Sequence, residues 1–223
     1  MLYALSDDRY TVYPQSYSIT SVNLLGPEPF EHEIISEKFL KGWLHPDKPT
    51  PTIREVFLLG YFTQEGHTYV RNFDNYYNSV GNMKMLFHGT RYECRIGTGA
   101  YKNACASETC NLCKIIKGSY SMEWTKGRGM FGPGIYTTEV SSKADDYVDN
   151  ASASKNDRIM IVNQVALGRS KIMYEASRNM QAAPPMYDSV TAATYSQGGK
   201  VRYHEAIVYQ EEAICPIAIV VYS

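Results

Sequence analysis

The chain has 223 residues, of which 44% are hydrophobic and 20% charged, and its formal net charge is −1 at pH 7. This composition predicts one folded domain, alone or with an extension, and the near-zero charge argues against a nonspecific phosphate-binding surface. No apolar run approaches the ~20 residues that a membrane span needs, so no membrane partner is expected. No secretory signal is recognisable at the start, so we expect an intracellular protein, cytoplasmic or nuclear.

The first third of the chain predicts helices more than strands. Residues 1–28 have no sustained hydrophobic period and form an expected N-terminal extension. Apolar residues at four-residue steps predict a helix over 30–43, which three prolines then terminate. A short apolar run over 53–59 has strand length, and a second helical period covers 69–80, with Gly81 as its C-cap.

The rest of the chain predicts mainly strands, rich in Val, Ile and Tyr, over 85–88, 159–167, 201–209 and 214–222. Between them, the spacing of Ser142 and Asp145 resembles a capping box that opens a short helix. Helices come first and strands later, without regular alternation. This order favours an α+β fold with a largely antiparallel sheet.

Three short blocks stand out in this part. They read LFHGT at 86–90, GMFGPGIY at 129–136 and YHEAIVY at 203–209. In this order they resemble the signature blocks of the diphtheria-toxin-like ADP-ribosyltransferases, specifically the catalytic domain of poly(ADP-ribose) polymerases. The resemblance runs from about Trp43 to the C-terminus. It implies an ADP-ribosyltransferase fold over 29–223, with a split sheet, an N-terminal helical portion and NAD as co-substrate.

The resemblance also implies which residues bind NAD. His88 would hold a ribose hydroxyl of the adenosine half, and Thr90 would supply a further hydroxyl. Gly89 has no Cβ, so its backbone could reach the nicotinamide carboxamide. Tyr136 and Tyr147 match the two aromatic residues that enclose the nicotinamide ring, where a good ring pair contributes about 0.5–1.5 kcal/mol beyond burial.

Glu205 is the candidate catalytic carboxylate and completes a triad with His88 and Tyr136. It stands in an apolar stretch, where an unpaired charge is costly. The resemblance implies that it binds the 2′-hydroxyl of the nicotinamide ribose and stabilises the oxocarbenium-like transition state. The structural alternative is an ion pair, for example with Arg202.

Two departures from the family pattern bear on function. Ala144 stands where many relatives carry a serine that bonds the carboxamide. One neutral hydrogen bond is worth about 0.5–1.5 kcal/mol, so NAD binding would be up to about tenfold weaker unless another hydroxyl compensates. The stretch between Val190 and Tyr203 is also short compared with the acceptor-side loop of chain-building polymerases. This length favours mono-ADP-ribosylation over polymer synthesis.

Four of the five cysteines fall in one window, at Cys94, Cys105, Cys110 and Cys113. The last two have the spacing of a zinc knuckle, and thiols are expected to be reduced in a chain without a secretory signal. We therefore predict a structural zinc site that orders residues 91–128, the loop expected to cover NAD on the donor side. Free cysteines and disulfides remain the alternatives.

The sequence thus predicts an NAD+ ADP-ribosyltransferase whose acceptor is a protein rather than a nucleic acid. Three alternatives stay open. The same site with water as acceptor would be an NAD glycohydrolase. A non-catalytic module that binds NAD or ADP-ribose is compatible with Ala144, although Glu205 argues against it. A zinc-stabilised interaction module would neither bind nor cleave NAD.

Overall fold

The computed structural model describes four ranges of the chain, residues 23–61, 64–125, 129–151 and 157–223. Most of the extension predicted over 1–28 therefore lies outside the described residues. The described end of that stretch, Asn23–Leu25 (β1), is a strand that pairs antiparallel with β2 (Ile53–Gly60). In the described part of the chain, no helix is both long and apolar enough to cross a membrane.

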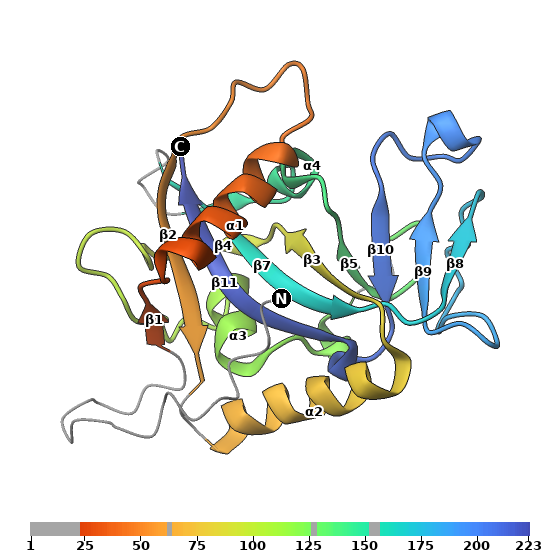
Figure 1. Cartoon of the computed structure of the whole chain (residues 1–223), viewed down its shortest axis with the longest axis horizontal. Coiled ribbons are helices and arrows are strands. Elements are labelled where there is room, and N and C mark those ends of the chain that lie inside the picture. The colour runs from red at the N-terminus through yellow and green to blue at the C-terminus, as the bar shows by residue number, and fades with distance from the viewer. Residues whose placement is uncertain (1–22, 62–63, 126–128, 152–156) are drawn as a thin grey trace.

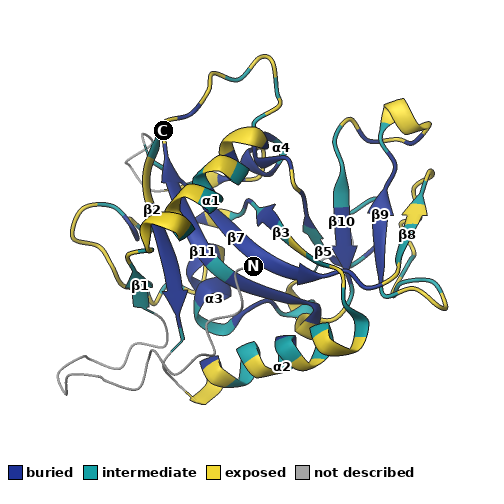
Figure 2. Ribbon diagram, in the orientation of Figure 1, coloured by how far each residue is buried: buried dark blue, intermediate teal, exposed yellow. Residues whose placement is uncertain are grey.

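Five strands form the larger sheet in the order β1-β2-β11-β7-β3, and every neighbouring pair is antiparallel. Its central strands are β11 (Ile214–Tyr222) and β7 (Arg158–Ala166), and β3 (Met83–His88) is one edge. Both central strands are buried along nearly their whole length (Figure 2). Continuous apolar runs of this kind are expected in strands that are covered on both faces.

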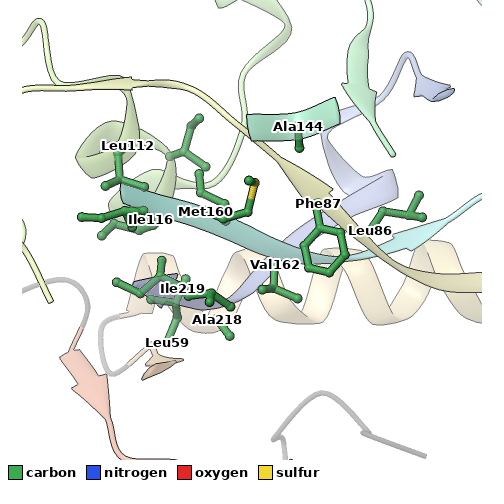
Figure 3. Packing of buried hydrophobic residues seen from close by; sticks show 14 of the residues in the cluster. Leu59, Leu86, Phe87, Leu112, Ile116, Ala144, Met160, Val162, Ala218 and Ile219 are labelled. Carbon is green, nitrogen blue, oxygen red and sulfur yellow. The ribbon is translucent and has the colours of Figure 1, made fainter. Parts of the chain in front are cut away.

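Three longer helices pack with this sheet (Figure 1). They are α1 (Pro29–Lys41), α2 (Gln64–Val80) and α3 (Asn111–Gly118). Residues of α1 and α3 share one buried cluster with the sheet, which includes Phe87, Val162 and Ile219 (Figure 3). The α2 helix packs through Phe73 in a separate cluster. The core therefore extends to the end of β3, directly beside His88.

A second sheet of four strands lies to one side of the first (Figure 1). Its order is β5 (Ile135–Thr137), β10 (Glu205–Val208), β9 (Ser189–Ala192) and β8 (Ser170–Met173). The first two pairings are antiparallel and the last is parallel. This arrangement confirms the predicted α+β fold with a split, largely antiparallel sheet.

The remaining elements are short. A two-stranded parallel pair joins β4 (Arg91–Tyr92) to β6 (Asp149–Asn150), and α4 (Ser141–Asp145) follows β5. Three 3-10 helices complete the described residues: η2 (Met122–Trp124), η3 (Tyr195–Gln197) and η4 (Glu211–Ala213).

Both predicted helices and the strand at the C-terminus are confirmed, and Gly81 ends α2 with a φ of 71°. The strand predicted over 201–209 is shorter, so Glu205 begins β10 and is not inside it. The capping box was wrong. The N-cap of α4 is Val140, without a side-chain cap, and the Ser142 hydroxyl accepts hydrogen bonds from the backbone N–H groups of residues 44 and 45.

Candidate active site

One cavity of about 700 Å³ opens where the two sheets meet, a size typical of small-molecule sites. Five of the six residues predicted to bind NAD or to catalyse line it: His88, Gly89, Tyr136, Tyr147 and Glu205. Thr90 is not among the lining residues, so the structure does not bring its hydroxyl into the cavity with the others. The Thr90 carbonyl instead accepts a hydrogen bond from the backbone of Asp149.

The two sheets are joined beside this cavity by a pair of backbone hydrogen bonds between Phe87 and Thr138, of 2.7 and 3.1 Å. This bridge sets the end of β3 next to β5. Pairing of β5 with β10 places Tyr136 opposite Ile207, and Glu205 lies two residues before Ile207. Three segments far apart in the sequence therefore contribute to one wall.

A hydrogen bond to the main chain sets the tautomer of His88. Its Nδ1–H donates to the carbonyl oxygen of Tyr136 at 2.8 Å, which leaves Nε2 as the acceptor atom of a neutral ring. Burial lowers the pKa of His88, although the bond to Tyr136 acts in the opposite direction. A neutral ring with a free acceptor suits a hydrogen bond from a sugar hydroxyl.

Residue 89 must be glycine because the backbone of Ala144 lies directly against it. A Cβ at this position would collide with the backbone carbonyl of Ala144, so α4 and the end of β3 can approach only if residue 89 is glycine. Gly132 has a φ of 74°, which favours glycine in the turn before β5. These glycines let three backbone segments approach the cavity closely.

The two predicted aromatic residues differ in their surroundings. The Tyr136 hydroxyl accepts from the backbone N–H of Phe131 at 2.8 Å and donates to the carbonyl of Gly132 at 3.0 Å, so this ring is held by the glycine turn. Burial raises the pKa of Tyr136, which keeps its hydroxyl protonated. Tyr147, by contrast, is 61% exposed and stands at the rim.

Glu205 is one half of a partly buried ion pair. Its Oε1 lies 2.9 Å from Lys143 Nζ, and the two side chains are only 12% and 13% exposed. Lys143 also donates to the carbonyl of Tyr203 at 2.7 Å. Burial lowers the pKa of Lys143, and Glu205 partly offsets this effect. The ion pair expected as the structural alternative is therefore present, but its partner is Lys143 and not Arg202, whose guanidinium lies over the ring of Tyr203.

Sequence reasoning missed several residues that line the cavity, among them His45, Lys143, Asp146 and Arg178. His45 comes from the proline-rich connector after α1, where its Nδ1 lies 2.8 Å from Ser142 Oγ. The two residues are 97 positions apart, so no local pattern could reveal the contact. Lys143 could have been found from the sequence, because it directly precedes Ala144, the position compared with the serine of the family.

The four clustered cysteines converge in space. Their sulfur atoms all lie within 4.8 Å of one another, and Cys94 Sγ is 3.4 Å from Cys113 Sγ and 3.8 Å from Cys110 Sγ. Four sulfurs around a tetrahedral zinc at ~2.3 Å would be about 3.8 Å apart, so the donor set fits this metal. Cys215 lies apart from them in the core.

The comparisons with known proteins agree with this geometry. The sequence model of the family described as the poly(ADP-ribose) polymerase catalytic domain matches residues 37–218. The chain is also 26% identical, over 139 residues or 61% of its length, to the protein mono-ADP-ribosyltransferase PARP4 of Mus musculus. It spans only 7% of the length of that relative. The matched family region contains His88, Tyr136 and Glu205.

Proposed function

The chain belongs to the family of poly(ADP-ribose) polymerase catalytic domains, which are NAD+ ADP-ribosyltransferases, and on this basis we propose that it cleaves NAD, releases nicotinamide and transfers ADP-ribose to an acceptor. The observation that carries the proposal is the convergence of His88, Tyr136 and Glu205 on one cavity. Neither sheet alone supplies all three, so their common wall depends on the whole fold.

Each residue of the triad has a distinct task in this reaction. His88 accepts a hydrogen bond from a ribose hydroxyl at Nε2, since Nδ1 is engaged by Tyr136. The Tyr136 ring forms the flat wall against which nicotinamide lies, and the exposed Tyr147 supplies the opposite wall. Together with the Gly89 backbone, these groups orient the bond between nicotinamide and ribose.

Glu205 provides the negative charge that the transition state needs. As that bond breaks, positive charge develops on the ribose, and a carboxylate fixed beforehand stabilises it without reorganisation. The ion pair with Lys143 fixes the carboxylate through Oε1. We propose that the other oxygen, Oε2, accepts a hydrogen bond from the 2′-hydroxyl of the ribose.

The acceptor side favours a single transfer over chain growth. Between β9 and β10 the chain makes one 3-10 turn, η3, and leaves little surface to hold a growing polymer. The Mus musculus relative is named a mono-ADP-ribosyltransferase, which is compatible with this preference. Because the chain has a net charge of −1, it lacks the positive surface that would attract a nucleic acid, and a protein is the better acceptor.

All five cysteines of the chain are free of disulfides, which suits a reducing compartment inside the cell.

Incubation of the purified chain with labelled NAD and a cell lysate tests the proposal. We expect nicotinamide release together with label retained on protein, one ADP-ribose per modified site by mass spectrometry. Glu205→Gln should lower nicotinamide release at least about a hundredfold, since loss of an electrostatic stabiliser costs on the order of 10²–10³ in rate. Glu211→Gln, outside the cavity lining, is the matched control.

Three outcomes would contradict the transferase assignment. Free ADP-ribose as the sole product would indicate a glycohydrolase. NAD binding in calorimetry without nicotinamide release would indicate a non-catalytic module. Equal rates for Glu205→Gln and wild type would remove Glu205 from catalysis.

We further propose that Cys94, Cys105, Cys110 and Cys113 hold a structural zinc ion. The sulfur spacing and the all-thiolate donor set support this assignment. Bound zinc would join α3 to the loop after β4, and we assign it no part in the chemistry. A site of this type can contribute on the order of 10–16 kcal/mol of binding free energy, enough to order the described part of this loop, residues 91–125.

Elemental analysis of purified protein checks the metal. We expect about one zinc per chain, lost in Cys113→Ser and retained in Cys215→Ser, which changes a cysteine outside the cluster. Protein free of zinc after expression in zinc-supplemented medium would contradict the proposal.

A further inference from the structure

The α3 helix connects the cysteine cluster to the wall of the cavity. Cys110 is its N-cap residue and Cys113 lies in its first turn, while Lys117 in the last turn donates to the carbonyl of Cys105. The chain then reverses at Ser119, where φ is 60°, and delivers Tyr120 to the core. Both ends of α3 thus contact the cysteine cluster. Tyr120, which follows the reversal, packs in the core.

Tyr120 packs directly on His88. The two rings meet edge to face, with centroids 5.3 Å apart and an interplanar angle of 89°. The Tyr120 hydroxyl donates to Asn163 Oδ1 at 2.9 Å, and Asn163 in turn donates to the carbonyl of Leu86, in the strand that ends at His88. The ring and the hydroxyl therefore both engage the element that carries His88.

Tyr120 does not line the cavity, so it acts on a bound substrate only through His88. Among the described residues the imidazole makes one hydrogen bond, at Nδ1, and a single bond leaves the ring free to tilt about that contact. The Tyr120 ring packs against the imidazole and limits this tilt. An aromatic pair of this geometry contributes about 0.5–1.5 kcal/mol beyond burial.

The helix that delivers Tyr120 is too short to be stable alone. It has eight residues and no side-chain hydrogen bond at its N-cap, whereas isolated helices shorter than ~12–15 residues are marginal in water. Its stability must come from buried side chains such as Ile116 and from the cysteines at its N-cap and in its first turn, Cys110 and Cys113. Loss of the cluster would therefore loosen the helix and, with it, Tyr120.

We propose that Tyr120 is a positioning residue for His88, and that the cysteine cluster controls the NAD site through α3 and Tyr120. The role of His88 rests on the proposed function, and the control by the cluster rests on the proposed metal. The consequence is that loss of the metal weakens NAD binding without changing any residue of the cavity.

Nuclear magnetic resonance of protein with ¹⁵N-labelled histidine tests the contact, because the chain has only five histidines and His88→Gln identifies the signal. In wild type we expect a single neutral tautomer with the proton on Nδ1. Tyr120→Leu should give mixed tautomers and move the pKa of His88 up toward its ordinary value, because water reaches the ring. Tyr120→Phe keeps the ring and should keep the wild-type tautomer.

The affinity for NAD should follow the same order. Tyr120→Leu should raise the Kd for NAD about three- to tenfold, the equivalent of one aromatic contact, with kcat for nicotinamide release changed less than twofold. Ser189→Ala, which removes a buried hydrogen bond outside α3 and the cavity, controls for loss of stability and should alter neither readout. An unchanged His88 signal in folded Tyr120→Leu would overturn the positioning role.

Removal of the metal from wild-type protein by a chelator tests whether the cysteine cluster controls the NAD site. We expect the His88 signals and the Kd for NAD to change in the same direction as in Tyr120→Leu, and to recover when zinc is added back. Folded protein that has lost its zinc and retains the wild-type His88 signals would overturn control by the cluster. Neither readout of His88 requires turnover. A chain that released no nicotinamide while these signals moved would contradict the proposed function and leave the positioning role standing.

Discussion

The hydroxyl groups nearest to Ala144 in the sequence and the cavity are engaged elsewhere. Four side chains could in principle replace a serine at this position, and each donates to a backbone carbonyl: Ser141, Ser142, Thr137 and Thr138. We therefore expect a bound nicotinamide carboxamide to rely on the backbone of Gly89 rather than on these hydroxyls. One missing neutral hydrogen bond weakens binding, but it leaves the proposed catalytic carboxylate, Glu205, untouched.

Ala144→Ser should restore this hydrogen bond and lower the Kd for NAD, by up to about tenfold if the bond is worth its upper value of about 1.5 kcal/mol. Calorimetry in the Glu205→Gln background measures the affinity without turnover. Ala144→Gly alters the same position without adding a hydroxyl and should not tighten binding. A serine variant that binds NAD no better than the alanine chain would show that the carboxamide does not reach residue 144.

At the level of elements, β5 holds the site together. Its backbone pairs with β10, and the residue that follows it, Thr138, bridges to Phe87 of β3. The Thr138 hydroxyl also donates to the carbonyl of His204 at 2.6 Å and accepts from the backbone N–H of Val140 at 3.0 Å. This one side chain therefore joins the start of β10 to the start of α4, which carry Glu205 and Lys143.

Thr138→Val should cost about 1–3 kcal/mol of unfolding free energy, because it leaves one buried and one partly buried backbone group without a partner. It should also lower kcat for nicotinamide release about tenfold, since Glu205 directly follows His204. Urea denaturation and rate measurements check both effects. Ser189→Ala removes a buried hydroxyl bond of 2.7 Å outside the cavity, and we expect it to lower stability alone. Equal losses of activity in the two variants would contradict the role given to Thr138.

At the level of the whole molecule, the larger sheet recruits a strand from before α1. The partly buried β1 pairs with β2 over three residues, although the sequence places this segment in the extension. We propose that the catalytic unit spans residues 29–223, with β1 as an addition that protects the edge of the sheet. Covering an edge strand also reduces its tendency to pair with another chain.

A chain of residues 29–223 should therefore remain active but melt a few degrees below one of residues 23–223. Three short backbone pairings at a half-exposed edge are worth about 1–2 kcal/mol, and each kcal/mol shifts the melting temperature of a domain of this size by about 2–4 °C. Calorimetric scans and NAD turnover of the two chains check the prediction. Loss of activity in the shorter chain would place β1 inside the catalytic unit.

The sequence by itself determined the regular elements whose stability is local or fully apolar. The periods of α1 and α2 and the apolar run of β11 are readable because the same side chains that form the pattern also bury in the core. The three blocks around His88, Tyr136 and Glu205 were recognised as well, through their resemblance to the signature blocks of a known family.

The tertiary structure alone decided which partners these residues have. Ser142 and Asp145 have the spacing of a cap, yet Ser142 binds the backbone after α1, and Asp145 binds Lys48, Arg158 and Tyr222. Lys143 forms an ion pair with Glu205, which lies 62 positions later in the sequence, and Tyr120, which follows α3, packs against the ring of His88. Hydrogen bonds and ring contacts act over a few ångströms of space and do not depend on separation along the chain. Only the folded arrangement of the two sheets therefore determines which of these residues meet.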